Sequence, residues 1–202
     1  MLKMKIFFYS LLSNPNFYNF TQHLLGASAF RKKFIENLFI KKNAKILDIG
    51  CGTSTVIKFL NEPEYYGYDI SSKNINFCKK KFGNLGNFYN KVFTKDELIH
   101  LPKFDYIFLF GFIHHINDND VISLFKILKL CLKPNGYICT IDGVLEKKQN
   151  SIARFLISRD RGQFVRTKES YIKLTKDIFF SLKTEIIHWK FFPYTYMTMI
   201  MK

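Results

Sequence analysis

The most constraining feature of the sequence is a regular alternation of strand-like and helix-like segments. An apolar run at 44–49 ends in Gly50-Cys51-Gly52, and a helical pattern follows to about Leu60. The same order recurs downstream, with strand patterns at 65–70, 88–93, 104–110 and 137–142 and helix patterns at 71–82 and 118–132. Strands that alternate with helices form a mostly parallel sheet with helices on both faces. The sequence therefore predicts a doubly wound α/β fold.

The two ends of the chain do not follow this alternation of strands and helices. An amphipathic helix is expected at 28–41, before the first strand. After a basic stretch at 145–170, a helix pattern at 168–182 precedes two strand patterns at 185–191 and 194–200. Pro193 separates the last two strands, which we expect to form an antiparallel hairpin at the sheet edge. The sheet would then have seven strands.

Lys and Arg number 31 against 16 Asp and Glu, which gives a formal charge of +15 at pH 7. Such an excess is typical of proteins that bind nucleic acid or an anionic membrane. The chain is also rich in Phe, Ile, Asn and Lys and poor in Ala, Gly and Pro, a bias that an AT-rich genome produces without selection on any surface. Because lysines occur on nearly every predicted helix, we treat the general basicity as background and do not expect a nucleic-acid partner.

The sequence has no run of the roughly 18 to 20 apolar residues that a membrane-spanning helix requires, although contact with a membrane surface stays open. The apolar run at 6–12 is short and lacks a small-residue cleavage site, so we expect a short helix of the mature protein there. The four cysteines are far apart, with no C-x-x-C pair: Cys51, Cys78, Cys131 and Cys139. This spacing argues against a zinc site or a disulfide framework and favours a reducing, cytoplasmic setting.

The glycine turn after the first strand is the expected ligand site, because ligands of doubly wound sheets bind at the carboxyl ends of the strands. A dinucleotide-binding turn has a third glycine three residues after the second, but position 55 is threonine. A P-loop would continue with Gly-Lys and Ser or Thr, which is absent. The turn therefore excludes both of these nucleotide-binding classes.

Residues 46–54, Ile-Leu-Asp-Ile-Gly-Cys-Gly-Thr-Ser, resemble the first motif of the class I S-adenosylmethionine-dependent methyltransferases. Ser54 stands where the motif has its third glycine. The resemblance implies a Rossmann-like methyltransferase fold and S-adenosyl-L-methionine as the cofactor. It implies cofactor contacts from Asp48, Gly50, Cys51 and Gly52. The cofactor has no pyrophosphate, so two glycines suffice, and Asp48 would put a negative charge near its sulfonium cation.

Residues 66–71, Tyr-Gly-Tyr-Asp-Ile-Ser, resemble the second-strand motif of the family, whose acid binds both ribose hydroxyls. The resemblance implies that Asp69 and Ile70 contact the cofactor, whereas a purely structural alternative makes Asp69 a cap of the next helix. The family often carries another acid after its third strand, near the adenine amino group. Lys91 stands in that place here and Asp96 could substitute for the acid, so the adenine contact stays unassigned.

Residues 104–118 resemble the fourth-strand segment of the family, F-D-x-I…G-x-L-H-H-L-x-D, which implies that Phe110 and Gly111 lie at the cofactor. Residues 132–137 resemble its L-K-P-G-G turn before the fifth strand. The N/D/S-P-P-Y/F motif of enzymes that methylate amino groups of DNA bases or glutamine is missing after the fourth strand. Its absence favours the branch that acts on small molecules, sugars, lipids or quinones.

His114 is the candidate catalytic residue, because histidine is the usual general base for an attacking hydroxyl. The alternative is that one residue of the pair His114 and His115 packs under the turn and the other caps the next helix. Consecutive residues of extended backbone point to opposite sides, so at most one can act as a base. Neither is compulsory, since methyl transfer can proceed largely by holding donor and acceptor in line.

Acceptor binding is expected from segments outside the cofactor core. Residues 17–26 resemble an N-terminal lid segment of such enzymes, which implies acceptor-side roles for Tyr18 and Gln22, although simple core packing explains the aromatic residues equally well. Arg159, Arg161 and Arg166 are candidates to bind an anionic acceptor, because guanidinium groups bind carboxylate and phosphate bidentately. The alternative is a set of ion pairs with Asp160 and Glu169 that fixes the cap.

The sequence thus predicts one methyltransferase domain over 1–202, with an N-terminal helical lid (1–42), a cofactor-binding core (43–143), a basic insertion (144–170) and a C-terminal helix and hairpin (171–202). The expected activity is methyl transfer, mainly by positioning, to an anionic small-molecule, sugar or lipid-linked acceptor without a metal. The alternatives are a non-catalytic protein that binds S-adenosylmethionine and an RNA methyltransferase. The oligomeric state is not predicted.

Overall fold

The computed structural model describes residues 27–158, 162–189 and 193–202. Its sheet has the strand order β3-β2-β1-β4-β5-β8-β7, and the short strand β6 pairs with β5 off this path. The strands are β1 Lys45–Ile49, β2 Glu64–Tyr68, β3 Gly86–Tyr89, β4 Phe104–Phe110, β5 Leu132–Leu145, β6 Arg166–Thr167, β7 Leu182–Trp189 and β8 Tyr194–Met201. From β3 to β5 all neighbours are parallel, whereas β8 is antiparallel to β5 and to β7. The predicted mostly parallel sheet with a C-terminal hairpin is confirmed, and β6 is an addition to the seven expected strands.

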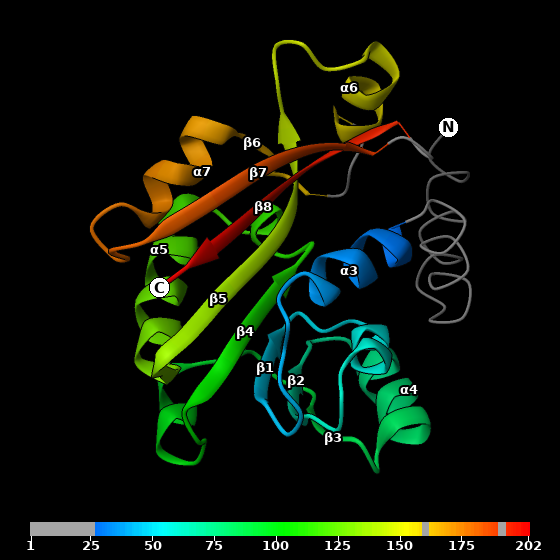
Figure 1. Cartoon of the computed structure of the whole chain (residues 1–202), viewed down its shortest axis with the longest axis vertical. Helices are drawn as coiled ribbons and strands as arrows, with labels where there is room; N and C mark the ends of the chain where they lie inside the picture. Colours follow the sequence, from blue (N-terminus) through cyan, green and yellow to red (C-terminus); the bar gives the residue numbers. More distant parts are fainter. Residues whose placement is uncertain (1–26, 159–161, 190–192) are drawn as a thin grey trace.

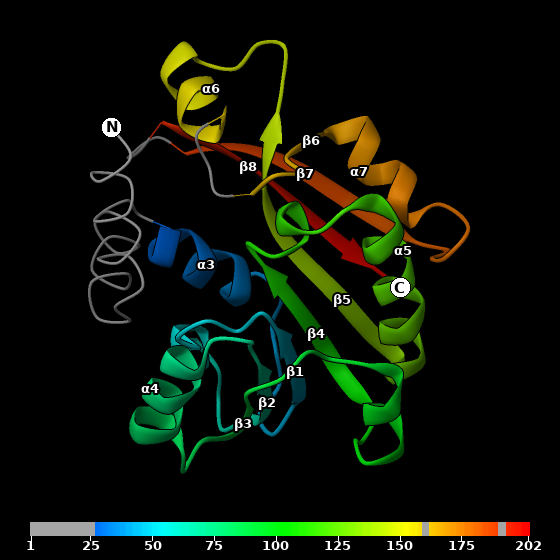
Figure 2. The same ribbon diagram turned by 180° about the vertical axis from the view of Figure 1, so that it is seen from behind.

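Helices cover both faces of the sheet (Figures 1 and 2). The α-helices are α3 Ala27–Glu36, α4 Ser72–Phe82, α5 Asp118–Cys131, α6 Ser151–Ser158 and α7 Lys168–Thr175, and the 3₁₀ helices are η1 Thr55–Phe59, η2 Lys95–Ile99 and η3 Ile113–His115. The buried faces of α3 and α4 form one apolar cluster with the sheet, and those of α5 and α7 form the other. The crossover helices thus leave the carboxyl ends of the strands to carry the site.

Local sequence signals explain where several helices begin and end. Ser71 caps α4 by accepting a hydrogen bond from the Asn74 amide at 3.3 Å. The cap of α5 is Asn117 rather than the residues at 118 or 119, because its side-chain oxygen accepts from the Asp120 amide at 3.0 Å. Helix α7 ends earlier than predicted, and Asp177 beyond it has a positive φ of 65°, which an α-helix cannot continue through.

Two other segments also differ from the expectations. The third strand is short and lies at 86–89, and the helical stretch after the glycine turn is only the 3₁₀ helix η1. The expected turn at 133–136 lies within the bounds of β5. The pairing of β5 with β4 is irregular there, because Leu132 pairs with Phe104 while Tyr137 pairs with Tyr106. These differences leave the order of elements unchanged.

Candidate cofactor site

The glycine turn leaves β1 in a conformation that depends on glycine. Gly50 has a φ of 68° and Gly52 a φ of 54°. A Cβ on Gly50 would lie 2.2 Å from the ring of Phe112, whereas a Cβ on Gly52 would meet no atom within 4 Å. The amides of Gly50 and Cys51 both donate to the Tyr68 carbonyl, at 2.8 and 3.0 Å, so the turn is fixed to the end of β2. The backbone at Gly52 therefore borders open space.

Asp69 links this turn to the start of α4. One carboxylate oxygen accepts from the Gly52 amide at 2.8 Å, and the other accepts from the Ser71 amide at 2.8 Å. Oδ1 also accepts a long hydrogen bond of 3.5 Å from the Asn74 side chain, and Oδ2 keeps a lone pair for a further donor. Ile70 follows with 76% of its side chain exposed beside this carboxylate. An exposed isoleucine at a strand end offers an apolar surface to a flat ring.

Asp48 is buried at the base of the turn and accepts a hydrogen bond from the Tyr65 hydroxyl. Burial raises the pKa of Asp48 to about 7, while the Tyr65 hydrogen bond and the charge of Arg31 act in the opposite direction. A cation placed near this carboxyl would therefore favour its ionised form.

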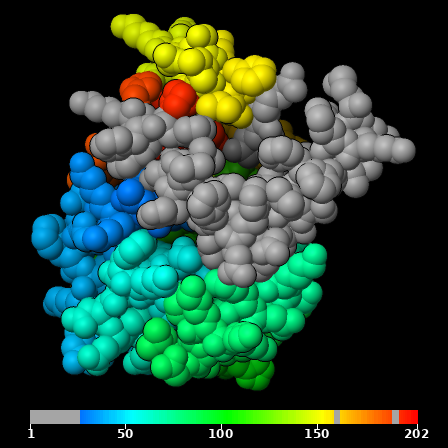
Figure 3. All heavy atoms as spheres, turned by 90° about the vertical axis from the view of Figure 1, so that its right-hand side faces the viewer, coloured from blue at the N-terminus to red at the C-terminus, as the bar shows by residue number. Residues whose placement is uncertain are grey.

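A recess of about 370 Å³, counting the part open to solvent, lies over the turn. Its lining residues are Arg31, Asp48, Gly50, Cys51, Gly52, Thr53, Thr55, Val56 and Phe110. Figure 3 shows α3, in blue, lying against the cyan residues that follow β1. Five residues expected at the cofactor thus meet at one recess, with a sixth, Asp69, bonded to its rim. Gly111 borders it as well, since a Cβ there would lie 3.8 Å from Arg31.

Arg31 is the lining residue that sequence reasoning missed. It is half-buried, and it makes no hydrogen bond or ion pair with the residues that the structure describes. In the sequence it is one of several basic residues on an amphipathic helix. Only the packing of α3 over the turn distinguishes it from Lys32 and Lys33, which are exposed.

The residues after β3 make contacts that the sequence did not predict. Lys91 forms an ion pair with Glu97 at 2.7 Å, and Glu97 also accepts from the Tyr68 hydroxyl at 2.8 Å. Asp96 is exposed on η2. The Asn90 side chain donates to the Asp69 carbonyl at 3.1 Å, so an amide rather than an acid lies next to Asp69 at the end of β3.

His114 lies at the other side of the β4 end and is buried. Its Nδ1 is 2.6 Å from a carboxylate oxygen of Asp142, and its backbone amide donates to the same oxygen at 3.3 Å. Burial raises the pKa of Asp142, and the hydrogen bond from His114 counteracts this shift. Asp142 thus fixes the orientation of the imidazole ring through Nδ1. Gly162 packs on the ring, because a Cβ there would lie 2.0 Å from Cδ2.

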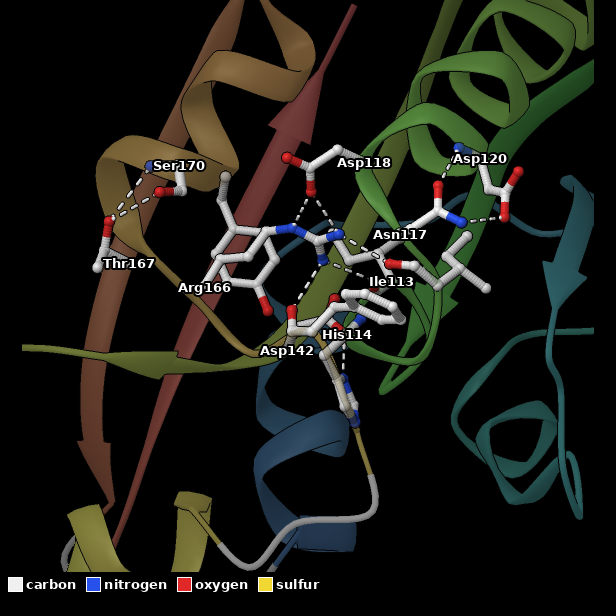
Figure 4. A network of polar contacts seen from close by, with 12 residues as sticks. Ile113, His114, Asn117, Asp118, Asp120, Asp142, Arg166, Thr167 and Ser170 are labelled. Carbon is white, nitrogen blue, oxygen red and sulfur yellow. Dashed lines mark hydrogen bonds and ion pairs between the residues drawn. The ribbon is translucent and has the colours of Figure 1, made fainter.

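The side chain of Arg166 binds the loop between β4 and α5 (Figure 4). Its guanidinium donates to Asp118 through Nε at 2.8 Å, and Nη2 forms an ion pair with the same carboxylate oxygen at 2.7 Å. The remaining donors bind backbone carbonyls of Ile113 and Phe164 at 2.9 Å each and of Ile116 at 2.7 Å. All three guanidinium nitrogens thus contact groups of the protein, and Asp118 is the acidic partner of Arg166 among the described residues. The expected acceptor contact of Arg166 stays a prediction.

The other acceptor candidates, Tyr18, Gln22, Arg159 and Arg161, lie outside the described residues. Within the described parts of the chain, no helix is long and apolar enough to cross a membrane. The same parts contain no group of three or more His, Cys, Asp or Glu side chains arranged to hold a metal ion.

The strand order and the glycine turn define a class of protein, the Rossmann-like methyltransferase fold. Human N-acetylserotonin methyltransferase has this fold with a TM-score of 0.69 at 18% identity, covering 96% of this chain and 58% of that one. The plantazolicin methyltransferase matches with a TM-score of 0.65 at 17% identity, covering 96% of this chain and 93% of that one.

Sequence comparisons find methyltransferases. Residues 47–138 match the family model described as a methyltransferase domain. The ubiquinone biosynthesis O-methyltransferase of Pelagibacter ubique is 36% identical over 115 residues, 52% of this chain and 45% of that protein. Phosphoethanolamine N-methyltransferase of Plasmodium falciparum is 28% identical over 133 residues, 62% of this chain and 48% of that protein. The chain thus contains a methyltransferase domain at 47–138, within a fold shared with S-adenosylmethionine-dependent methyltransferases.

The chain spans only part of its curated relatives. It covers 32% of phosphoethanolamine N-methyltransferase 1 of Arabidopsis thaliana, at 26% identity over 161 residues, and 48% of the Plasmodium protein.

Proposed function

We propose that this chain binds S-adenosylmethionine in the recess over the glycine turn and transfers its methyl group to a small-molecule, sugar or lipid-linked acceptor. The observation that carries the proposal is the convergence on one recess of a positive-φ glycine turn, a carboxylate with a lone pair left over and a half-buried arginine. These three features match the three chemically distinct parts of the cofactor. The relatives that the comparisons name include methyltransferases of phosphoethanolamine and of ubiquinone biosynthesis.

The residues fit the cofactor part by part. Asp69 would accept a hydrogen bond from the ribose, and Ile70 would pack on the adenine ring. The open space at Gly52 would admit the amino-acid portion close to the backbone. Arg31 would bind the cofactor carboxylate bidentately. Asp48 would face the positive side of the molecule, which would hold its carboxyl ionised near neutral pH.

The bound cofactor supplies an electrophilic methyl group on a sulfonium. The protein then has to hold an acceptor atom in line with that methyl group and exclude water. His114 is the candidate base, because it lies at the end of β4 and Asp142 orients its ring through Nδ1. Where the acceptor atom carries no proton to remove, His114 and Asp142 contribute only to the shape of the site.

We propose that the acceptor molecule is anionic. Arg159, Arg161 and Arg166 are the arginine candidates to bind it, with Tyr18 and Gln22 on the lid. A cytoplasmic location is consistent with four free cysteines among the described residues.

Isothermal titration with S-adenosylhomocysteine, the demethylated product, tests the binding step. Arg31→Gln is expected to weaken binding about tenfold, since a charge-assisted bidentate contact is lost. Lys32→Gln is the matched control, because Lys32 is the exposed neighbour on the same helix. Its affinity should equal that of the wild type.

A screen of cell extract with labelled methyl donor tests the transfer step. Methyl incorporation that disappears with Arg31→Gln at limiting donor supports the proposal. Absence of any binding by the wild-type protein would refute it. Tight binding with no acceptor in any extract would instead favour a non-catalytic protein that binds the cofactor.

A further inference from the structure

Two thiols meet beneath the glycine turn. Cys51 belongs to the turn and lines the recess, while Cys78 lies on the buried face of α4. The Cys78 thiol donates to the Gly52 carbonyl at 3.3 Å, and the Cys51 sulfur lies 3.9 Å from the same oxygen. The two sulfurs thus lie around one carbonyl oxygen, and both thiols are free. Neither the fold nor cofactor binding requires a pair of thiols at this place.

The two sulfurs are not equivalent. Cys78 is fully buried at 0% exposure, whereas Cys51 lines the recess. Cys51 is the partly exposed member, so small oxidants reach it first.

We propose that Cys51 and Cys78 form an oxidisable dithiol that controls the shape of the cofactor recess, with a peroxide as the oxidant. Hydrogen peroxide converts the Cys51 thiol to a sulfenic acid and releases one water. The Cys78 sulfur then attacks the Cys51 sulfur, the S–S bond forms, and the hydroxyl leaves as a second water. The two thiols lose two hydrogens and two electrons, and the peroxide is reduced to two waters.

The disulfide changes the turn for a geometric reason. Bonded sulfurs lie about 2.05 Å apart, much closer than sulfurs in van der Waals contact, so the turn has to move toward α4. The Gly52 carbonyl loses its thiol donor at the same time. Because the Gly52 amide is bonded to Asp69 at 2.8 Å, this movement also displaces the carboxylate that we assign to the ribose. The resulting loss of cofactor affinity rests on the proposed function, whereas disulfide formation does not.

The chain supplies its own controls. Cys131 and Cys139 are buried at 2% and 0% exposure in α5 and β5. Neither should react under conditions that oxidise the pair at the turn.

Reduced full-length protein is treated with millimolar hydrogen peroxide and mapped as unreduced peptides by mass spectrometry. We expect a peptide pair joined at Cys51 and Cys78 with the loss of two hydrogens. The dissociation constant of S-adenosylhomocysteine, measured before oxidation, after it and after dithiothreitol, should rise at least tenfold and then recover. Cys78→Ser keeps a donor for the Gly52 carbonyl and should form no such link, so peroxide should leave its own affinity unchanged, while a Cys131→Ala, Cys139→Ala double variant should respond like the wild type.

Oxidation of Cys51 to higher acids without a link to Cys78 would overturn the proposal, and so would a link accompanied by unchanged affinity. If the reduced protein binds no S-adenosylhomocysteine, the proposed function fails. The peptide map still decides whether the dithiol forms, so the two failures are distinguishable.

Discussion

At the scale of single residues, Asp48 shows how the site and the stability of the fold oppose each other. The carboxyl is 3% exposed and its neighbour Tyr65 supplies one hydrogen bond. Burial moves its pKa from the ordinary value of 3.8 to about 7. Between about pH 4 and pH 7, the folded protein therefore keeps a proton on Asp48 that the unfolded chain has released. Stability from this group is lost as the pH rises through that window, and above it the buried charge is a cost.

Asp48→Asn removes this cost and keeps an acceptor for Tyr65. We expect the free energy of unfolding of the variant to rise relative to wild type as the pH increases from 4 to 7 and to stay higher above it. Cofactor affinity at pH 8 should fall, because the negative charge near the sulfonium is gone. Urea unfolding across pH and titration with S-adenosylmethionine measure the two effects. A stability difference that does not change with pH would show that Asp48 is not the titrating group.

At the scale of elements, Arg166 joins segments that the alternating pattern does not connect. It anchors β6 to the loop that carries His114, and it is only 7% exposed. We expect Arg166→Met to lower the free energy of unfolding by about 3 kcal/mol, because three carbonyls and a carboxylate lose their donor. Denaturant unfolding measures this loss. Arg154→Ala is the control, since Arg154 is exposed and the described residues give it one side-chain hydrogen bond, to the Glu146 carbonyl. An Arg166 variant with normal stability but weakened acceptor binding would support the acceptor role.

The same elements show which features could be predicted from the sequence. Helix α4 with its Ser71 cap and the turn at Gly50 depend on signals within a few residues, so both were predictable. The ion pair of Arg166 was not, because its carboxylate partner Asp118 lies 48 residues away and only local acids were visible. Arg31 was missed for the same reason, since its place at the recess follows from how α3 packs. Sequence patterns specify elements, while contacts between distant elements require the fold.

At the scale of the whole molecule, the charge of +15 remains to be explained. Exposed lysines occur on elements of both faces, among them Lys32 on α3, Lys79 on α4 and Lys126 on α5. A distributed charge attracts polyanions weakly, because few lysines contact a phosphate backbone at once. The recess needs only one of the basic residues, Arg31.

We therefore expect single-stranded RNA to bind with micromolar or weaker affinity at low salt and to dissociate at physiological salt, as fluorescence anisotropy would measure. Lys79→Gln on α4 and Lys126→Gln on α5 should reduce the low-salt affinity by similar factors, since neither belongs to a dedicated groove. Saturating S-adenosylhomocysteine should leave it unchanged, because the charges lie outside the recess. Nanomolar affinity at physiological salt, or a loss confined to one of the two variants, would point to a built nucleic-acid surface and revive an RNA acceptor.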